Sequence, residues 1–380
     1  MSRQYDYIIA GMGCAGLSLA MQLKTSAIPF KKVLLIDKDL KNQNDRTWCF
    51  WTKTKDAWYE PIIKRQWEQL LFVADEAQTL HISPYRYCLI EGLDFYAYCL
   101  KSLATDQRFD IIQGEISTMS GEGNKATLQS GQESYEAKLI FNSALRQHHY
   151  QKGHNNLVQH FKGWKVTFDE AVVDAGCPVF MDFSIDQQND CRFVYTIPFS
   201  AHSALVEYTG FSAEGIGDKE YDEALAVYMS KKYPGAAYRV TSTEKGQIPM
   251  YESEFINPFG ERVINIGTAG NASKASSGYT FYFIQQMVGE VTAQLMKDAN
   301  KVRLEKKPWR FRFYDKVLLD VISKKTAEPK YIFARLFKRN QSVAVFDFLN
   351  EESNWRQEIK ILNSLPKIPF LKSGLRKVRG

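Results

Sequence analysis

Three glycines near the start of the chain have the spacing of a turn that binds a dinucleotide. Gly11, Gly13 and Gly16 form a Gly-x-Gly-x-x-Gly pattern, and Asp37 follows the last glycine by 21 positions. In such a turn the first glycine permits a tight bend, the second lets the backbone approach a pyrophosphate, and the third allows a helix to pack closely on a strand. The acidic residue then accepts hydrogen bonds from the adenosine ribose. The alternative interpretation is a glycine-rich turn that holds no ligand.

The residues around this turn predict the elements that would position it. Residues 5–10 form a short apolar run typical of a buried parallel strand, and residues 33–36 form a second run that ends on Asp37. Small and apolar residues between the two runs predict a helix. The unpaired N–H groups and the partial positive charge at the N-terminus of this helix favour bound phosphate.

A second glycine-rich edge follows much later in the chain. Residues 262–266 predict a strand that runs into Gly-Thr-Ala-Gly at 267–270. Ser-Gly-Tyr-Thr at 277–280 then precedes apolar residues at helical spacing between Phe281 and Leu295. An NAD site needs one βαβ unit, whereas the two glycine-rich edges together predict FAD.

The patterns between and after these edges predict further elements. A helix is predicted over residues 92–104, and a strand at 109–112 is predicted to continue the parallel sheet through Glu115 and Ile116. Residues 125–135 predict an antiparallel meander and residues 138–142 a buried strand. Short apolar runs flanked by Gly, Pro or Asn over 155–250 predict an inserted antiparallel sheet, with a helix at 222–231. Residues 301–380 predict more helices.

The bulk composition is that of an ordinary globular protein. A chain of 380 residues with 24% charged and 44% hydrophobic residues suits two domains or one large split domain. The six cysteines form no Cys-x-x-Cys pair and no metal-ligand spacing, so we expect reduced thiols and no metal. The first strand begins by Tyr5, which leaves no room for a signal peptide, and no long apolar run predicts a membrane span. We therefore expect a cytoplasmic protein.

The charge is divided unevenly along the chain. Residues 301–380 hold 20 Lys or Arg and 8 Asp or Glu, a balance of +12, whereas the whole chain carries +6. Aromatic residues are interspersed among the basic ones. This mixture fits an anionic bilayer surface or a nucleic acid, and a solvated helical face explains it equally well.

Several motifs in a fixed order resemble those of one protein family. Beside the two glycine-rich edges, the chain contains Asp-Arg-Thr-Trp-Cys-Phe-Trp at 45–51, Gln-His-Phe-Lys-Gly-Trp at 159–164, Phe-Met-Asp at 180–182, Tyr-Thr-Ile-Pro-Phe at 195–199, Val-Glu-Tyr-Thr at 206–209 and Gly-Gln-Ile-Pro at 246–249. On these motifs the chain resembles, over roughly residues 3–295, the FAD-containing lycopene cyclases. These belong to a flavoprotein superfamily that includes aromatic hydroxylases and geranylgeranyl reductases.

The resemblance implies an α/β fold, namely a Rossmann-like FAD-binding flavoprotein fold of the glutathione-reductase and aromatic-hydroxylase type. The implied FAD-binding domain comprises residues 1–150 and 256–300. An antiparallel β-sheet substrate domain at 151–255 is inserted into it, and a basic helical region at 301–380 follows. The implied FAD-binding residues are Gly11, Gly13, Cys14, Ala15, Gly16, Asp37, Lys38, Arg46, Ile116, Gly267, Thr268, Ala269, Gly278, Tyr279 and Thr280.

The resemblance also implies a reaction without net redox change. In the family, the ψ end of lycopene is protonated at its terminal alkene, an internal double bond attacks the cation, and proton loss gives a β-ionone ring. The flavin must be reduced, with NAD(P)H as the expected reductant. Lycopene and related carotenoids are the expected partners, and no nucleic acid is expected. Because such substrates reside in bilayers, we expect a cytoplasmic protein bound peripherally to the inner membrane.

The resemblance assigns Glu207 as the proton donor, with Asp182 as a second choice that supports the acid or receives the released proton. In the predicted strand, Leu205, Glu207 and Thr209 face one way. A carboxyl group among apolar neighbours is disfavoured as an anion, so its pKa should rise and it can carry a proton at neutral pH. The alternative is an ordinary strand residue that faces solvent.

The chain departs from the family pattern at three positions. Tyr208 stands where the family usually has a second acidic residue, which bears on how the proton donor is supported. Ala275 and Asn142 replace a common proline and a common aspartate. Two other functions stay open: a flavin-dependent hydroxylase or prenyl-chain (geranylgeranyl) reductase, and a flavin-free prenyl-lipid binding protein. The former would consume NADPH stoichiometrically, and the latter would be colourless.

Overall fold

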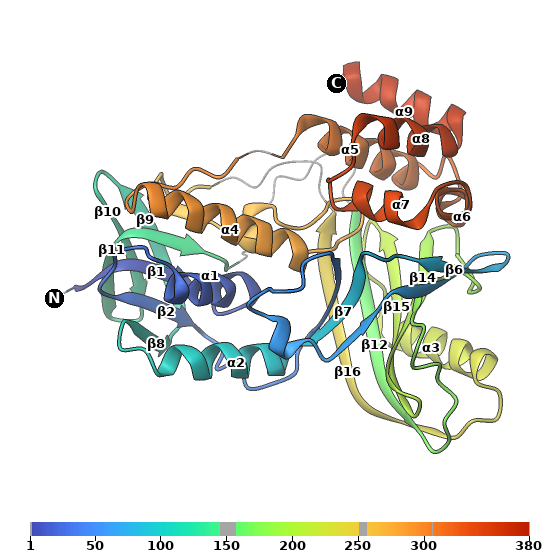
Figure 1. Cartoon of the computed structure of the whole chain (residues 1–380), viewed down its shortest axis with the longest axis horizontal. Helices are drawn as coiled ribbons and strands as arrows, with labels where there is room; N and C mark the ends of the chain where they lie inside the picture. The colour runs from blue at the N-terminus through green and yellow to red at the C-terminus, as the bar shows by residue number, and fades with distance from the viewer. Residues whose placement is uncertain (1, 145–156, 251–256, 306, 380) are drawn as a thin grey trace.

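The first sheet of the computed structural model contains the predicted nucleotide-binding strands (Figure 1). The structure describes residues 2–144, 157–250, 257–305 and 307–379, so the predicted domain boundaries at 150–151 and 255–256 lie outside the described residues. The parallel strands of this sheet are β8 (Phe109–Gln113), β2 (Val33–Asp37), β1 (Arg3–Ala10), β11 (Glu133–Asn142) and β17 (Val263–Asn265), in that order.

Both faces of this sheet are covered, which explains the continuous buried apolar runs at residues 7–10 of β1 and 33–36 of β2. Helices α1 (Cys14–Thr25), α2 (Gly92–Ala104) and α4 (Phe281–Lys297) pack on one face, where Tyr7 and Ile9 are fully buried. The alternate residues of β1 point to the other face and pack against the meander that precedes β11. The three helices predicted for this part of the chain are therefore confirmed.

The predicted continuation of the parallel sheet through Glu115 and Ile116 is wrong. β8 ends at Gln113, and Ile116 begins β9 (Ile116–Glu122), which pairs antiparallel with β10 (Lys125–Ser130). The chain turns at Gly114, where an added Cβ would lie 2.6 Å from Ser130 Oγ. Apolar alternation marks a strand but not the strand with which it pairs, so the sequence pattern did not reveal that this segment joins the antiparallel meander.

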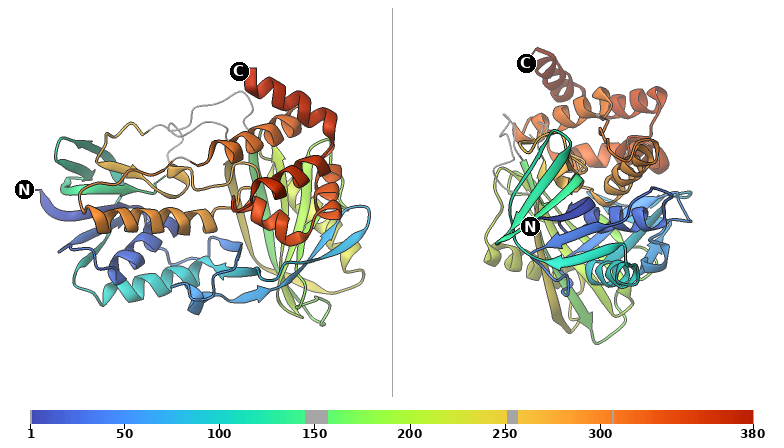
Figure 2. Two further views of the ribbon diagram at one scale, coloured as in Figure 1. Left: turned by 45° about the horizontal axis from the view of Figure 1, so that its top comes forward. Right: turned by 90° about the vertical axis from the view of Figure 1, so that its left-hand side faces the viewer.

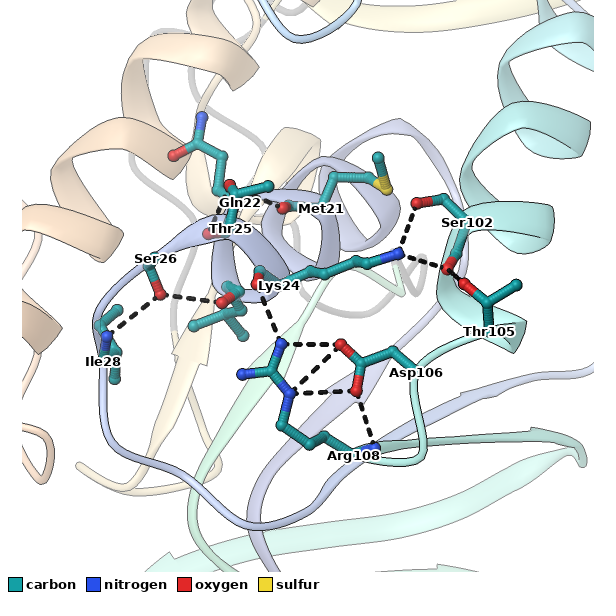
Figure 3. Close-up of polar contacts among 11 residues, drawn as sticks. Met21, Gln22, Lys24, Thr25, Ser26, Ile28, Ser102, Thr105, Asp106 and Arg108 are labelled. Atoms are coloured by element: carbon teal, nitrogen blue, oxygen red, sulfur yellow. Dashed lines mark hydrogen bonds and ion pairs between the residues drawn. The ribbon is translucent and has the colours of Figure 1, made fainter.

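Polar contacts hold the C-terminal ends of α1 and α2 together (Figure 3). Lys24 Nζ donates to the carbonyl oxygen of Ser102 at 2.6 Å and to its Oγ at 2.9 Å. Arg108, paired with Asp106 at 2.7 Å, donates to the carbonyl oxygen of Lys24 at 3.0 Å. These cations satisfy C-terminal carbonyl groups that have no partner within a helix.

The second sheet is larger than the segment from which it was predicted. Its strands lie in the order β16 (Tyr238–Met250), β12 (Leu157–Phe168), β15 (Ser203–Ser212), β14 (Cys191–Ser200), β13 (Val179–Asp182), β5 (Gln69–Val73) and β6 (Ala77–His81). Pairing is antiparallel except between β13 and β5. The first 150 residues thus contribute two strands. A small sheet of β3 (Thr47–Thr52), β7 (Arg86–Glu91) and β4 (Arg65–Trp67) lies nearby.

The two faces of the second sheet pack against different helices. One face packs on α3 (Asp218–Lys232), which begins four residues before the predicted helix. The other face packs on helices of the C-terminal region (Figures 1 and 2). These helices are α5 (Trp309–Ser323), α6 (Pro329–Arg339), α7 (Ser342–Leu349), α8 (Trp355–Ser364) and α9 (Lys367–Arg379).

One buried ammonium group joins the second glycine-rich segment to the C-terminal helices. Lys274 is 2% exposed, and its Nζ lies 2.7 Å from Asp315 of α5 and 3.0 Å from Glu351 after α7. Buried charges are tolerated only when they are paired and hydrogen-bonded. This cluster therefore fixes the loop between β17 and α4 relative to α5.

Removing the ammonium group should strongly destabilise the protein. Lys274→Met leaves two carboxyl groups in a buried site, so we expect the free energy of unfolding to fall by about 3–5 kcal/mol. As a matched control, Lys219→Met removes the exposed partner of Glu223, and should change it by about 0.5 kcal/mol or less. Urea unfolding measures both variants, and equal effects would contradict the structural role of Lys274.

Candidate active site

A cavity of about 820 Å³ lies between the first and second sheets and brings most of the predicted cofactor residues together. Thirteen of the fifteen line it: Gly11, Gly13, Cys14, Ala15, Asp37, Lys38, Arg46, Ile116, Gly267, Thr268, Gly278, Tyr279 and Thr280. Gly16 and Ala269 do not line the cavity. An added Cβ at Gly16 would collide with the carbonyl oxygen of Gly11, so this glycine permits close packing of α1 on β1.

The first glycine-rich turn presents the N-terminus of α1 to the cavity. Gly11 has φ +101°, a conformation that residues with a side chain rarely adopt. Gly13 precedes the first residue of α1, and an added Cβ there would meet nothing within 4 Å. Asp37 stands beside this turn, because its Oδ2 accepts a hydrogen bond from the backbone N–H of Met12 at 2.6 Å. The arrangement fits a pyrophosphate and an adjoining ribose.

The second glycine-rich edge lines the same cavity beside the first turn. The short 3-10 helix η3 (Gly267–Gly270) begins with φ +64°, and an added Cβ at Gly267 would lie 2.6 Å from the Cβ of Ala15. Two polar side-chain atoms that line the cavity, Gln159 Oε1 and Ser277 Oγ, are buried without a protein partner. Unpaired buried polar atoms are costly, so they indicate a polar ligand at this edge.

The pairing of four neighbouring strands places two carboxyl groups at the wall of this cavity. Glu207 of β15 lies opposite Tyr195 of β14 on one side and Gly163 of β12 on the other. Gly163 in turn lies opposite Glu244 of β16. Directly opposed residues share a face of the sheet, so both glutamates flank a position without a side chain. A Cβ at Gly163 would lie 3.2 Å from Glu244 Cγ and 3.5 Å from Glu207 Cβ.

The two carboxyl groups form a hydrogen-bonded pair with unequal proton affinity. Burial raises the pKa of Glu207 well above its usual value, and the negative charge of Glu244 raises it further. Burial also raises the pKa of Glu244, to about 7, against hydrogen bonds from Thr47 and Glu207 and the charge of Lys165. Thr47 Oγ1 donates to Glu244 at 2.8 Å, and Thr209 Oγ1 donates to Glu207 at 3.1 Å. Glu207 is therefore the protonated member at neutral pH.

The structure does not bring Asp182 to this cavity, which corrects its predicted role beside the acid. Asp182 lies opposite Val194, whose side chain packs on α3. Its carboxylate accepts a hydrogen bond from Tyr228 Oη of α3 at 3.0 Å and from the backbone N–H of Ser184 at 2.9 Å. Glu207 faces the other side of the same sheet, so Asp182 supports α3 rather than the acid.

Glu244 is the site residue that the sequence interpretation missed. It stands two positions before the Gly-Gln-Ile-Pro motif, so Glu244, Gly246 and Ile248 share one face of β16. This alternation could have indicated that Glu244 faces the same way as the motif. Only the pairing of β16 with β12 shows that this face also holds Glu207. Tyr208, which replaces the family's second acid, points to the α3 face and accepts a hydrogen bond from Arg192 at 3.0 Å.

Solved structures define the class of this fold. The chain is similar to a flavoprotein/dehydrogenase from Cytophaga hutchinsonii, with 13% identity, a TM-score of 0.67 and coverage of 99% of this chain and 100% of the other. A geranylgeranyl bacteriochlorophyll reductase-like protein from Thermoplasma acidophilum gives 12% identity, a TM-score of 0.60 and coverage of 100% and 99%. A mutant of halogenase PltM in complex with FAD gives 11% identity, a TM-score of 0.61 and coverage of 99% of this chain and 92% of the other. The chain therefore has the fold of the FAD-dependent flavoproteins.

Within this class, sequence similarity defines the family. Residues 6–375 match the family model described as lycopene cyclase protein, so the chain belongs to the lycopene cyclase family. It is 24% identical over 227 residues to lycopene beta-cyclase from Pantoea ananas, covering 58% of this chain and 56% of that protein. It is 28% identical over 229 residues to lycopene beta-cyclase from Paracoccus sp. (strain N81106 / MBIC 01143), covering 58% of this chain and 54% of that protein. The alignments thus span little more than half of either relative.

Removing the partner carboxyl should lower the proton affinity of Glu207. Glu244→Gln abolishes the neighbouring negative charge, so the pKa of Glu207 should fall while burial still holds it above the usual value. The infrared band of the protonated carboxyl, assigned by subtracting the spectrum of Glu207→Gln, follows this titration. Glu220→Gln on α3 serves as the control, and a band that titrates identically in Glu244→Gln and the wild type would disprove the coupling.

Proposed function

We propose that this chain is a FAD-dependent lycopene beta-cyclase, an isomerase that converts the ψ ends of lycopene to β-ionone rings. Family membership supports this proposal, and one observation carries it: a buried carboxyl group with a raised pKa, Glu207, at the wall of the cavity that both glycine-rich edges line. A hydrocarbon substrate offers no polar group to activate, so the reaction needs a protonated donor in a dry site, and stabilisation of the cation must supply much of the driving force.

FAD is the proposed cofactor, and the residues that would hold it are those of the two glycine-rich edges. The N-terminus of α1 would face its pyrophosphate, Asp37 its adenosine ribose, and the segment from Gly278 to Thr280 its ring end. When bound and reduced, FAD supplies negative charge that stabilises a developing carbocation. NAD(P)H is the proposed source of electrons for that reduction. Gln159 and Ser277 supply polar atoms at this edge that the protein leaves unpaired.

The carboxyl pair accounts for both proton transfers. Glu207 donates its proton to the terminal alkene and becomes a carboxylate, and the resulting tertiary cation is attacked by the internal double bond. The cyclised cation then loses a ring proton to the carboxylate pair, which restores the starting state without any change in redox level. Glu244 shares the remaining negative charge. Aromatic faces that stabilise cations also line the cavity: Trp48, Tyr87, Phe161, Tyr195, Tyr279 and Phe281.

A side chain at Gly13 should abolish cofactor binding without disturbing the fold. The protein itself leaves open space at this position, so Gly13→Val conflicts only with a ligand. Gly289 of α4 is equally open and serves as the control, since an added Cβ there also meets nothing within 4 Å. We expect colourless Gly13→Val and yellow Gly289→Val, measured by flavin absorbance. Full flavin occupancy in Gly13→Val would refute the assigned site.

Replacing the proton donor should stop cyclisation while the flavin stays bound. Glu207→Gln keeps the size of the side chain but removes the transferable proton, so turnover should fall by about 10²–10⁴-fold. Asp182→Asn is the matched control, a buried carboxyl of the same sheet that faces α3, and it should keep most activity. Because ionisation of Glu207 removes the donor, wild-type turnover should decline as the pH rises through the raised pKa of Glu207.

The assay also separates the competing functions. Lycopene and pre-reduced protein are mixed without oxygen, and the pigments are separated by chromatography. Continued turnover without further reductant, with deuterium from D₂O in the product ring, is expected. Consumption of one NADPH per product would identify a hydroxylase or a prenyl-chain reductase instead. Unimpaired turnover by Glu207→Gln would refute the assignment of the acid.

A further inference from the structure

A second cavity, of about 500 Å³, adjoins the first and differs from it in chemistry. Its lining is almost wholly apolar and aromatic, and comes from the second sheet and the C-terminal helices. Tyr195, Ser277 and Tyr279 line both cavities. Charged groups are nearly absent from this lining, so the second cavity fits a hydrocarbon.

Tyrosine side chains form the partition between the two cavities. Tyr279 Oη lies 3.4 Å from Tyr87 Oη and 3.4 Å from Tyr195 Oη. The Tyr279 ring packs edge-on against Trp51, with 4.3 Å between ring centroids, and lies nearly parallel to Phe180. Three tyrosine hydroxyl groups thus lie together where the two cavities adjoin, and Tyr195 is the cross-strand neighbour of Glu207.

The opposite end of the second cavity reaches the surface at α9. Leu371 and Leu375 line the cavity and are also 65% and 60% exposed, so they stand at its rim. Ile368 and Val378, 68% and 74% exposed, extend the same face of the helix at spacings of three and four residues. In both views of Figure 2, α9 is the outermost helix of its group.

The surroundings of this apolar stripe are basic. α9 contains Lys and Arg but no acidic residue, and Lys367 and Lys372 are exposed beside the stripe. Arg376 and Lys377 instead reach Asp320 of α5, which anchors the helix to the protein. Among the described residues, nine of the sixteen exposed large apolar side chains lie after residue 301. An apolar stripe flanked by cations is the pattern of a helix that lies in the surface of an anionic bilayer.

We propose that the α9 face docks on an anionic phospholipid bilayer and that the second cavity receives the long hydrocarbon part of the substrate directly from the acyl region. This inference rests on the proposed function for the identity of the hydrocarbon. No helix in the described part of the chain is long and apolar enough to cross a membrane. The substrate end that passes the tyrosine partition meets Glu207, while the remainder of its chain stays in the second cavity.

Docking is tested on flavin-loaded full-length protein with vesicles of phosphatidylcholine and phosphatidylglycerol. Flotation should show wild-type binding that weakens with salt. L371D/L375D should lose binding by about tenfold or more, because two charges would enter the apolar interface. K367E/K372E should lose about tenfold or more at low salt. Val227→Asp, at an exposed apolar position of α3, should bind as the wild type does. Equal binding by all variants would overturn the docking surface.

The cavity is tested at its rim. Gly374 of α9 lines the cavity, and an added Cβ there would lie 3.8 Å from Phe313, an ordinary contact. Gly374→Phe should therefore fold and bind vesicles but lose lycopene turnover, whereas Gly374→Ala should retain it. Full turnover by Gly374→Phe would overturn the route. Turnover of detergent-dispersed lycopene separates the two proposals. I368D/V378D changes the docking face at two exposed residues that do not line the cavity, so it should keep this turnover. A wild type that is inactive in detergent but still binds vesicles would refute the cyclase function alone.

Discussion

The register of β12 between two antiparallel neighbours is the constraint on which the proposed chemistry depends. Glu207 and Glu244 belong to strands that are not adjacent, and only Gly163 of β12 separates them. A slip of one residue in either pairing would turn one carboxyl to the opposite face of the sheet. Ten consecutive pairs between β12 and β15 fix one side, from Val158 with Ser212 to Thr167 with Ser203.

Bringing two carboxyl groups into a buried site is unfavourable unless their negative charge is neutralised or compensated. The protein keeps one proton between them, so that a single negative charge is buried and not two. Glu244 carries that charge beside the hydroxyl group of Thr47 and within the field of Lys165, whose Nζ itself pairs with Glu91 at 2.6 Å. The burial that disfavours a second negative charge therefore also keeps on Glu207 the proton that the proposed reaction needs.

The sequence predicted those features that are encoded locally. Three features each need a particular residue at a particular spacing, so they can be recognised in the sequence alone. They are the turn from Gly11 to Gly16, Asp37 at the end of the following strand, and the Gly-Thr-Ala-Gly edge at 267–270. The face of Glu207 also followed from simple alternation along one strand, and β15 confirms it.

What the sequence did not reveal depends on pairing between distant segments. Asp182 was named as a second choice that supports the acid or receives the released proton, yet a bulge between Val179 and Asp182 turns its carboxyl toward α3. The participation of β5 and β6 in the second sheet required the same kind of information. Glu244 is 37 positions from Glu207 in the chain, and no local spacing connects them.

The buried cluster around Lys274 has a consequence for how the two cavities communicate. The backbone of Lys274 bonds to that of Tyr279 at 2.9 Å and to that of Gly278 at 2.8 Å, so the loop is closed on itself. The ammonium group of Lys274 pairs with Asp315 of α5, and the other end of this loop carries Tyr279 of the partition. The loop therefore links α5 to the edge of the first cavity. By thermodynamic reciprocity, an occupant of either cavity that alters this loop changes the affinity of the other cavity by the same factor.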